Sequence, residues 1–272
     1  MRSGGIGRVS ESNSADFAKG DLVTGLIGAQ EVATVDASVL RKLPDLPDNE
    51  VYLHALGING FTAYFGMMEI GKPKEGETLV VSTAAGSVGS LVVCIGKILG
   101  MKVIGITGSE EKVEYVSGEL GADACINYKT TENLQEALAA LCPDGIDVYF
   151  DNVGGNQLDA CLALMNKFGR IIACGSISGY GGNPVPVTNY TNVIIKSLDY
   201  QGFIVLNYAP RFMEAVKKLG EWMQTGKIKY RHHVLHGIEN IPAAMKVLFS
   251  GDNIGKVLVR LSDPKPDEPK SS

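Results

Sequence analysis

Residues 79–99 of the chain read LVVSTAAGSVGSLVVCIGKIL, and this stretch decides the fold. The opening run is short and β-rich, as in a buried parallel strand, and residues 87–99 are long enough for several helical turns. The turn between them, AAGSVG, lies where the dinucleotide-binding fingerprint G-x-G-x-x-G requires it. The stretch therefore predicts a strand, a phosphate-binding turn and a helix in direct succession.

Gly86 and Gly89 hold the two more demanding positions of this fingerprint, and Ala84 replaces its first glycine. The second glycine lets the backbone approach a pyrophosphate, and the third lets helix and strand pack closely. Free amides and the positive end of the helix dipole complete an anion site. The alternative is a glycine-rich turn that merely connects strand to helix, but its place in a βαβ series favours phosphate binding.

The same alternation of apolar runs and helical segments continues along the chain. The predicted strands are residues 79–82, 102–106, 124–127, 147–151, 170–174 and 202–205, and the predicted helices are 87–99, 110–120, 133–141, 157–167 and 210–225. Repeated βαβ units of this kind form a doubly wound parallel Rossmann sheet, so the fold class is α/β.

The two ends of the chain differ from this middle part. Residues 4–7, 19–23 and 31–35 are expected to form short antiparallel strands with glycine turns, a piece of a β-domain too short to stand alone. A strand, a helix and the last strand, 256–261, follow Tyr230. The predicted domains are 1–50 and 231–261 for a β-domain, 51–230 for the Rossmann domain, and 262–272 for a disordered Pro- and Lys-rich tail.

Composition excludes several classes of protein. Of 272 residues, 45% are hydrophobic and 20% charged, which is ordinary for a globular protein. The net charge of −5, without a basic run, disfavours nucleic-acid binding. No apolar stretch approaches the ~20 residues of a membrane span, and no signal sequence opens the chain, so a cytoplasmic protein is expected. The five cysteines lack paired spacing, as is typical of reduced thiols.

The end of the second predicted strand bears on the choice of cofactor. An NAD or S-adenosylmethionine site would place an acidic residue there, whereas this chain has Thr107-Gly108-Ser109. Lys112 follows early in the next predicted helix, where it can meet a 2′-phosphate. The alternative is a solvated helix lysine, and the neighbouring Glu110 and Glu111 count against a phosphate.

No pattern of metal ligands or nucleophiles stands out. The sequence has no C-x-x-C, and His232 and His236 have helical zinc spacing without an accompanying Glu or Cys, so no metal site is expected. Cys174 has no histidine placed by sequence to activate it. No G-x-S-x-G is present to indicate a hydrolase.

Longer motifs carry a family resemblance that covers residues 5–261. They are GINGFTAY (57–64), AAGSVGS (84–90), GSEEK (108–112), NYK (127–129), FDNVGG (150–155), CGSIS (174–178) and GDNIGK (251–256). On these motifs the chain resembles the zinc-independent medium-chain dehydrogenases/reductases, in the branch of prostaglandin reductase (leukotriene B4 12-hydroxydehydrogenase) and alkenal double-bond reductase. Family members begin upstream of Gly5, so the resemblance implies an N-terminally truncated GroES-like catalytic domain.

The resemblance also implies a set of residues that bind NADP(H). It assigns the pyrophosphate to Gly86, Ser87, Val88 and Gly89, the 2′-phosphate to Lys112 and Tyr128, the rest of the cofactor to Asn152, Cys174, Gly175, Ser176, Ile177, Ser178 and Tyr180, the nicotinamide to Phe203, Ile204 and Val205, and a contact from the small domain to Asn253. Tyr64 and Tyr180 are the candidate catalytic donors, with packing alone as the alternative for each. Residues 192–196, NVIIK, lack the tyrosine that some members carry there, which leaves the proton donor open.

The resemblance implies an NADPH-dependent enzyme that reduces the carbon–carbon double bond of α,β-unsaturated aldehydes or ketones, including 15-oxoprostaglandin-like substrates. Hydride would be transferred to the β-carbon. A small hydrophobic enal or enone is the expected partner, with no nucleic acid and no membrane, and a homodimer is the expected assembly. Two alternatives remain: a quinone oxidoreductase, and a truncated noncatalytic NADPH-binding protein.

Overall fold

The computed structural model describes residues 3–182 and 185–261, and it separates the chain into two compact units. The larger unit is His54–Arg231, and the smaller unit combines Met1–Leu53 with His232–Ser272. The predicted limits of the Rossmann domain were 51 and 230. The predicted tail, 262–272, lies outside the described residues.

A six-stranded parallel sheet forms the centre of the larger unit, in the order β6-β5-β4-β7-β8-β9. The strands are β4 (Thr78–Ser82), β5 (Lys102–Thr107), β6 (Ala124–Asn127), β7 (Ile146–Asp151), β8 (Met165–Ala173) and β9 (Asp199–Gly202). This is the doubly wound Rossmann order, so the predicted fold class is confirmed.

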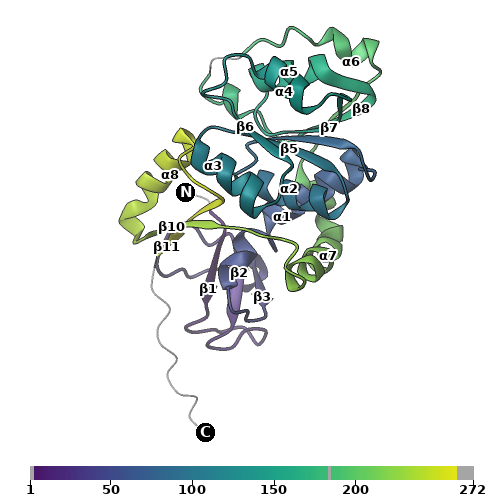
Figure 1. Ribbon diagram of the computed structural model, residues 1–272. Helices are drawn as coiled ribbons and strands as arrows, with labels where there is room; N and C mark the ends of the chain where they lie inside the picture. The colour runs from purple at the N-terminus through teal and green to yellow at the C-terminus, as the bar shows by residue number, and fades with distance from the viewer. Residues whose placement is uncertain (1–2, 183–184, 262–272) are drawn as a thin grey trace. The chain divides into compact units, whose positions relative to one another are not determined.

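Helices cover both faces of this sheet, with α1, α2 and α3 on one face and α4, α5 and α6 on the other (Figure 1). Their bounds are α1 (Ile58–Phe65), α2 (Gly89–Ile98), α3 (Glu110–Glu114), α4 (Leu134–Leu141), α5 (Gly155–Leu164), α6 (Thr191–Ile195) and α7 (Phe212–Gln224). Two π-helical turns, Gly66–Gly71 and Tyr115–Glu119, extend α1 and α3. Val80, Ile104, Tyr149 and Ile171 are almost wholly buried between the layers, as expected for strands covered on both faces.

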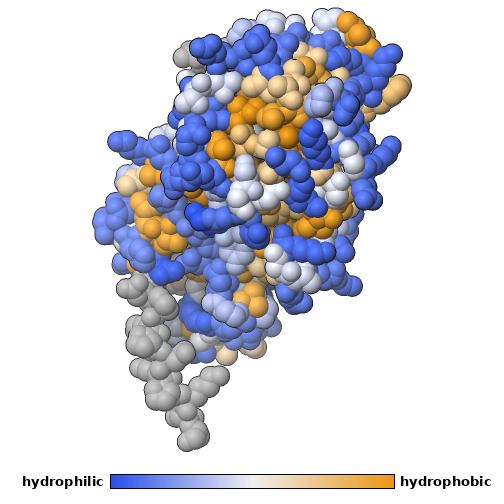
Figure 2. Space-filling model, viewed as in Figure 1, coloured by the Kyte–Doolittle hydropathy of each residue, from blue (hydrophilic) through white to orange (hydrophobic). Residues whose placement is uncertain are grey.

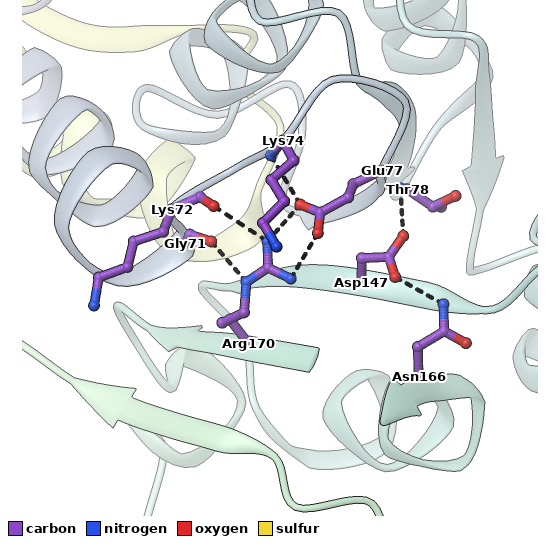
Figure 3. Close-up of polar contacts among 8 residues, drawn as sticks. All are labelled: Gly71, Lys72, Lys74, Glu77, Thr78, Asp147, Asn166 and Arg170. Carbon is purple, nitrogen blue, oxygen red and sulfur yellow. Dashed lines mark hydrogen bonds and ion pairs between the residues drawn. The ribbon is translucent and has the colours of Figure 1, made fainter. Parts of the chain in front are cut away.

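Arg170 joins three segments at the edge of the sheet where the strands begin (Figure 3). Its guanidinium donates to the Gly71 carbonyl at 2.8 Å and forms a bidentate ion pair with the Glu77 carboxylate. Beside it, the Asp147 carboxylate accepts from the Thr78 backbone at 2.9 Å. This polar network fixes the start of β4 against β7 and β8, at the edge opposite the glycine turn.

The smaller unit contains two small sheets. Strands β1 (Gly5–Arg8), β2 (Leu22–Gly25) and β3 (Leu40–Leu43) are antiparallel, and β10 (His232–His236) pairs in parallel with β11 (Lys256–Arg260), with α8 (Ile241–Ser250) between them in sequence. Short 3-10 turns, Ala37–Val39, Asn49–Leu53 and Ile238–Asn240, complete this unit. Strands therefore form at or near two of the three segments expected to be antiparallel, 4–7 and 19–23, and the expected closing strand, helix and strand are present.

One predicted strand was wrong, and two other predicted elements had wrong bounds. Residues 31–35 form no strand, because β2 already pairs on one side with β1 and on the other with β3. Residues 203–205 follow β9 instead of extending it, because the ladder with β8 ends at Ala173 and Gly202 and the chain turns into the 3-10 helix Val205–Arg211. The helix predicted to reach residue 167 ends at Leu164, since Met165 already pairs with Ile146.

None of the helices among residues 3–182 and 185–261 has the length and apolar character needed to span a membrane. On the face shown in Figure 2, hydrophobic residues come to the surface in separate patches bordered by hydrophilic ones.

Candidate cofactor site

The candidate site lies at the carboxyl ends of β4 and β7, the two central strands of the sheet. The chain leaves β4 toward β5 on one side and leaves β7 toward β8 on the other. Open α/β sheets bind their ligands at this point of reversal. The glycine turn, residues 83–89, begins where β4 ends at Ser82.

Close backbone contacts explain both glycines of the turn. A Cβ on Gly89 would lie 2.2 Å from the Thr83 carbonyl oxygen, and a Cβ on Gly86 would lie 2.8 Å from the Thr83 methyl group. The amide of Gly86 donates to the Thr83 carbonyl at 2.9 Å, which closes the turn. Val88 caps α2 with no side-chain hydrogen bond, and the Ser90 amide donates to the Gly86 carbonyl at 3.0 Å, so the remaining amides at the start of this helix can meet an anion.

Asp151 shapes the turn that follows β7. Its carboxylate is buried and accepts from the Tyr149 hydroxyl at 3.0 Å and from the amides of Val153 and Gly154 at 3.0 and 2.8 Å. Burial raises the pKa of Asp151, and the hydrogen bonds from the two amides and the hydroxyl oppose that shift. Asp151 therefore holds the next residue, Asn152, in a fixed turn.

Asn152 links the ends of the two central strands. Its backbone amide donates to Ser82 Oγ, and its side-chain amide donates to the Ser82 carbonyl, both at 2.8 Å. Ser82 Oγ in turn donates to the Phe150 carbonyl at 3.2 Å. The predicted cofactor residue Asn152 thus lies directly beside the start of the glycine turn.

The segment after β8, residues 174–180, lies against the turn that follows β7. Cys174 and Gly175 donate their amides to the Asp151 carbonyl at 2.9 and 3.1 Å, and Ser178 Oγ donates to the Val153 carbonyl at 2.6 Å. The Tyr180 side chain is exposed, and its hydroxyl accepts from the Ser176 amide at 3.5 Å. Burial raises the pKa of the Cys174 thiol to about 12, which agrees with a lining role instead of a nucleophilic one.

At the end of β5, the structure brings together the residues predicted to read a 2′-phosphate. Ser109 caps α3 by accepting from the Lys112 amide at 3.4 Å. A Cβ on Gly108 would lie 3.1 Å from Tyr128 Cε1 and 3.2 Å from Lys129 Cε. Lys129 is an exposed residue that the motif analysis did not assign, although it directly follows Tyr128 in the same segment.

Glu110 is one of the two acidic residues, with Glu111, that weighed against a phosphate here. Its carboxylate accepts from the Asn127 side-chain amide at 2.6 Å, and Asn127 is itself buried. The Asn127 Oδ1 atom accepts from the Lys129 amide at 3.1 Å. Glu110 is thereby engaged in holding the segment that carries Tyr128 and Lys129.

Tyr64 lies apart from this group in the hydrogen-bond network. Its hydroxyl donates to Glu214 on α7 at 2.9 Å, and Arg211 bonds the same carboxylate. Burial, with the Glu214 carboxylate as a further cause, raises the pKa of Tyr64 to about 12. The structure gives this hydroxyl a partner within the fold, and a catalytic role for Tyr64 stays a prediction.

The remaining predicted residues lie beyond the turn segments. Phe203 is half-buried and packs edge-on against Tyr208, with ring centroids 6.3 Å apart, whereas Ile204 is exposed and Val205 begins a 3-10 helix. Asn253 belongs to the smaller unit, where it is buried and donates to the Gly255 carbonyl at 2.8 Å. Their contacts with a cofactor stay predictions.

The histidines do not form the helical pair considered from their spacing. His232 and His236 lie on strand β10, where four residues span about 13 Å, too far for one metal ion. Sequence reasoning missed a cluster of His232 with Asp48 and Glu50, which no local spacing could reveal. Arg260 donates to Glu50 at 3.1 Å, so this cluster already holds a cation of the protein.

The residues at the switch point fit NADP(H). The turn at Gly86 and Gly89 has no room for a Cβ and leaves the start of α2 open to a pyrophosphate. At the end of β5, Gly108 has no side chain and leaves space beside the exposed ring of Tyr128, and Lys129 supplies positive charge. An acidic residue that would bind the ribose of NAD is absent from this strand end.

Comparisons with known proteins agree with this geometry. Residues 87–222 match the family model described as zinc-binding dehydrogenase. The Bacillus subtilis protein YfmJ is 48% identical over 268 residues, which cover 96% of this chain and 79% of YfmJ. Prostaglandin reductase 1 of Rattus norvegicus is 42% identical over 262 residues, covering 94% and 79% of the two chains.

A solved structure shares the fold closely. The crystal structure of CurA in complex with NADPH from Vibrio vulnificus superposes with a TM-score of 0.91 at 39% identity, covering 97% of this chain and 80% of CurA. The glycine turn and the absence of an acidic residue at the end of β5 agree with these relatives. The chain therefore belongs to the zinc-binding dehydrogenase family of medium-chain dehydrogenases/reductases, in the zinc-independent branch of NADP-dependent oxidoreductases that includes the prostaglandin reductases.

Proposed function

We propose that the protein reduces the carbon–carbon double bond of small hydrophobic α,β-unsaturated aldehydes and ketones with NADPH. The observation that carries this proposal is the end of β5. Glycine stands at position 108, where an NAD site would have an acidic residue, and Tyr128 and Lys129 lie beside it. It supports NADPH as the hydride donor. The names of two relatives, prostaglandin reductase 1 and the 2-alkenal reductase (NADP(+)-dependent) of Nicotiana tabacum, support reduction of an α,β-unsaturated substrate.

When bound, NADPH supplies a hydride to the β-carbon of the substrate, and negative charge then develops on the carbonyl oxygen. A group of this chain must donate a hydrogen bond to that oxygen. We assign this role to Tyr180, because its exposed hydroxyl lies beside the Ser176 amide in the segment that follows β8. Tyr64 is the weaker candidate, since Glu214 already binds its hydroxyl.

The predicted lining of the cofactor site belongs to the same proposal. Asn152 and residues 174–178 would lie along the cofactor from the ends of β7 and β8, and Phe203 and Ile204 would border the nicotinamide. In this arrangement the backbone of the strand ends binds the cofactor and the side chains exclude water.

A steady-state assay tests the proposed function. The purified chain, mixed with NADPH and 2-nonenal, should lose absorbance at the reduced-cofactor band. The same assay with simple quinones measures the alternative activity. Calorimetric binding of NADPH without turnover of any enal, enone or quinone would instead identify a noncatalytic binding protein.

We further propose that the protein forms a homodimer in the cytoplasm. Strand β9 lies at the edge of the larger sheet with all four residues exposed, and Ile194 and Ile195 are exposed just before it. An uncovered strand edge beside apolar side chains favours pairing with a second copy. Five free thiols support a reducing compartment. A monomeric mass in light scattering would contradict the dimer.

A further inference from the structure

His54, just before α1, and Asn59, in the first turn of α1, both bind Ser87, which lies between the two glycines of the turn. His54 Nε2 donates to the Ser87 carbonyl at 2.8 Å, and Asn59 Nδ2 donates to Ser87 Oγ at 3.2 Å. His54 is completely buried, and its ring meets Tyr230 edge-to-face at a centroid distance of 5.8 Å. His54 and Asn59, which lie outside the glycine fingerprint, therefore fix the carbonyl and the hydroxyl of Ser87, which lies inside it.

The backbone of this segment sets the spacing of His54 and Asn59. The amides of Gly57 and Gly60 both donate to the His54 carbonyl, at 3.2 and 3.0 Å. A Cβ on Gly60 would lie 1.8 Å from the Ala55 carbonyl oxygen, so the turn closes only with glycine there. His54 and the glycines of the motif GINGFTAY thus close a tight turn, from which the side chains of His54 and Asn59 both reach Ser87.

The bond from His54 determines which way a peptide group faces. In a trans peptide the carbonyl and the following N–H point in opposite directions. Because the Ser87 carbonyl points at His54, the amide of Val88 points away from His54. A carbonyl aimed at a phosphate would repel it, whereas an amide binds it. His54 therefore keeps the repulsive end of this peptide away from the anion.

The hydrogen bond from Asn59 leaves the Ser87 hydroxyl as a hydrogen-bond donor. A hydroxyl that accepts from an amide still has its own hydrogen to donate, and phosphate oxygens at neutral pH are acceptors. The Asn59 Oδ1 atom is buried and accepts from none of the residues that the structure describes. A buried acceptor without a partner destabilises the fold, so the fold keeps this amide in place at a cost in stability.

We propose that His54 and Asn59 are positioning residues for the cofactor pyrophosphate, His54 by turning the Ser87 carbonyl inward and Asn59 by making the Ser87 hydroxyl a donor to a phosphate oxygen. This inference rests on the proposed use of NADPH. Neither residue belongs to the glycine fingerprint, and neither is required to touch the cofactor.

Calorimetric dissociation constants test the inference. Asn59→Ala should weaken NADPH binding about three- to tenfold, the equivalent of one neutral hydrogen bond. Asn59→Asp should weaken it further, because a carboxylate would take the Ser87 hydrogen and repel the phosphate. Adenosine 2′-monophosphate lacks the pyrophosphate, and its dissociation constant should stay within twofold in both variants.

A double-mutant cycle separates positioning from general support of the fold. Ser87→Ala should itself weaken NADPH binding, and adding Asn59→Ala to it should change the affinity no further. His54→Gln keeps an N–H donor and should bind NADPH more tightly than His54→Leu. Asn133→Ala is the matched control, because it removes an asparagine whose side chain binds Glu136 at the start of α4, and it should leave both dissociation constants unchanged.

Equal losses for NADPH and adenosine 2′-monophosphate, or additive effects of Asn59→Ala and Ser87→Ala, would overturn the inference. Asn59→Asp binding as well as the unchanged chain would do the same. If the unchanged chain binds no NADPH at all, the proposed function fails and this inference with it. NADPH binding that is insensitive to Asn59 overturns the inference alone.

Discussion

In the proposed function, a few side chains around Gly108 decide the choice of cofactor. A Cβ there would meet both Tyr128 and Lys129, so an acidic residue at this position would crowd them as well as repel a phosphate. Lys112 was predicted from its place early in the helix after this strand and from the family resemblance, whereas Lys129 was identified only from the pairing of β5 with β6. Two lysines and a tyrosine hydroxyl are a sufficient donor set for a 2′-phosphate.

Lys112→Ala and Lys129→Ala should each weaken NADPH binding and leave NADH binding nearly unchanged. A charge-assisted hydrogen bond contributes about 1.5–3 kcal/mol, so the loss should be roughly ten- to a hundredfold for the lysine that binds the phosphate most directly. Tyr128→Phe should cause a smaller loss of the same kind. Paired dissociation constants for the two cofactors measure this, and Lys167→Ala, an exposed lysine on β8, is the control. Equal losses for NADPH and NADH would assign these lysines to the fold.

Cys174 should be chemically inert in the native protein. Burial raises its pKa to about 12, and thiolate is the form that reacts with alkylating agents. Each pH unit below that pKa lowers the thiolate fraction about tenfold, so labelling by iodoacetamide at pH 8 should be very slow and should speed up with every unit of added pH. Mass spectrometry of the Cys174 peptide, with and without denaturant, measures the rate. Complete labelling of the native protein within minutes at pH 8 would contradict this.

Elements with strong local signals were predictable from the sequence, and elements set by their neighbours were not. Strand β6 was predicted with the bounds that the structure shows, because an apolar run there ends at a polar turn. The end of β9 was missed because it is fixed by where its partner β8 ends. The π-helical turn after Glu114 was missed for a different reason, because the spacing of apolar residues does not distinguish it from an α-helix.

The Arg170 network should matter for stability without affecting cofactor binding. Arg170 and Glu77 are 15% and 16% exposed, and they join β8 to the start of β4 at the edge of the sheet away from the site. Arg170→Met keeps the apolar stem and leaves a partly buried carboxylate without its partner, at a cost of about 1.5–3 kcal/mol. Calorimetry should show a melting temperature lower by roughly 4–8 °C and an unchanged dissociation constant for NADPH. Weaker NADPH binding at full stability would contradict this separation.

For the molecule as a whole, the sequence predicted the sheet and the glycine turn but not the contacts that join distant segments. Tyr64 and Glu214 are 150 residues apart, and nothing local to either one indicates their hydrogen bond. The link between Asn59 and Ser87 spans 28 residues and was likewise invisible in the motifs. Such pairs follow from the packing of whole elements, and they account for most of what the structure adds to the site.

The central claim is that hydride from NADPH reaches the β-carbon of a conjugated carbonyl compound. The most direct test uses NADPH deuterated at the nicotinamide carbon that gives up the hydride, with 2-nonenal as substrate and mass spectrometry of the product. The account predicts saturated nonanal that carries deuterium at the β-carbon. An unsaturated alcohol with deuterium at the carbonyl carbon, or NADPH that binds without any deuterated product forming, would contradict it.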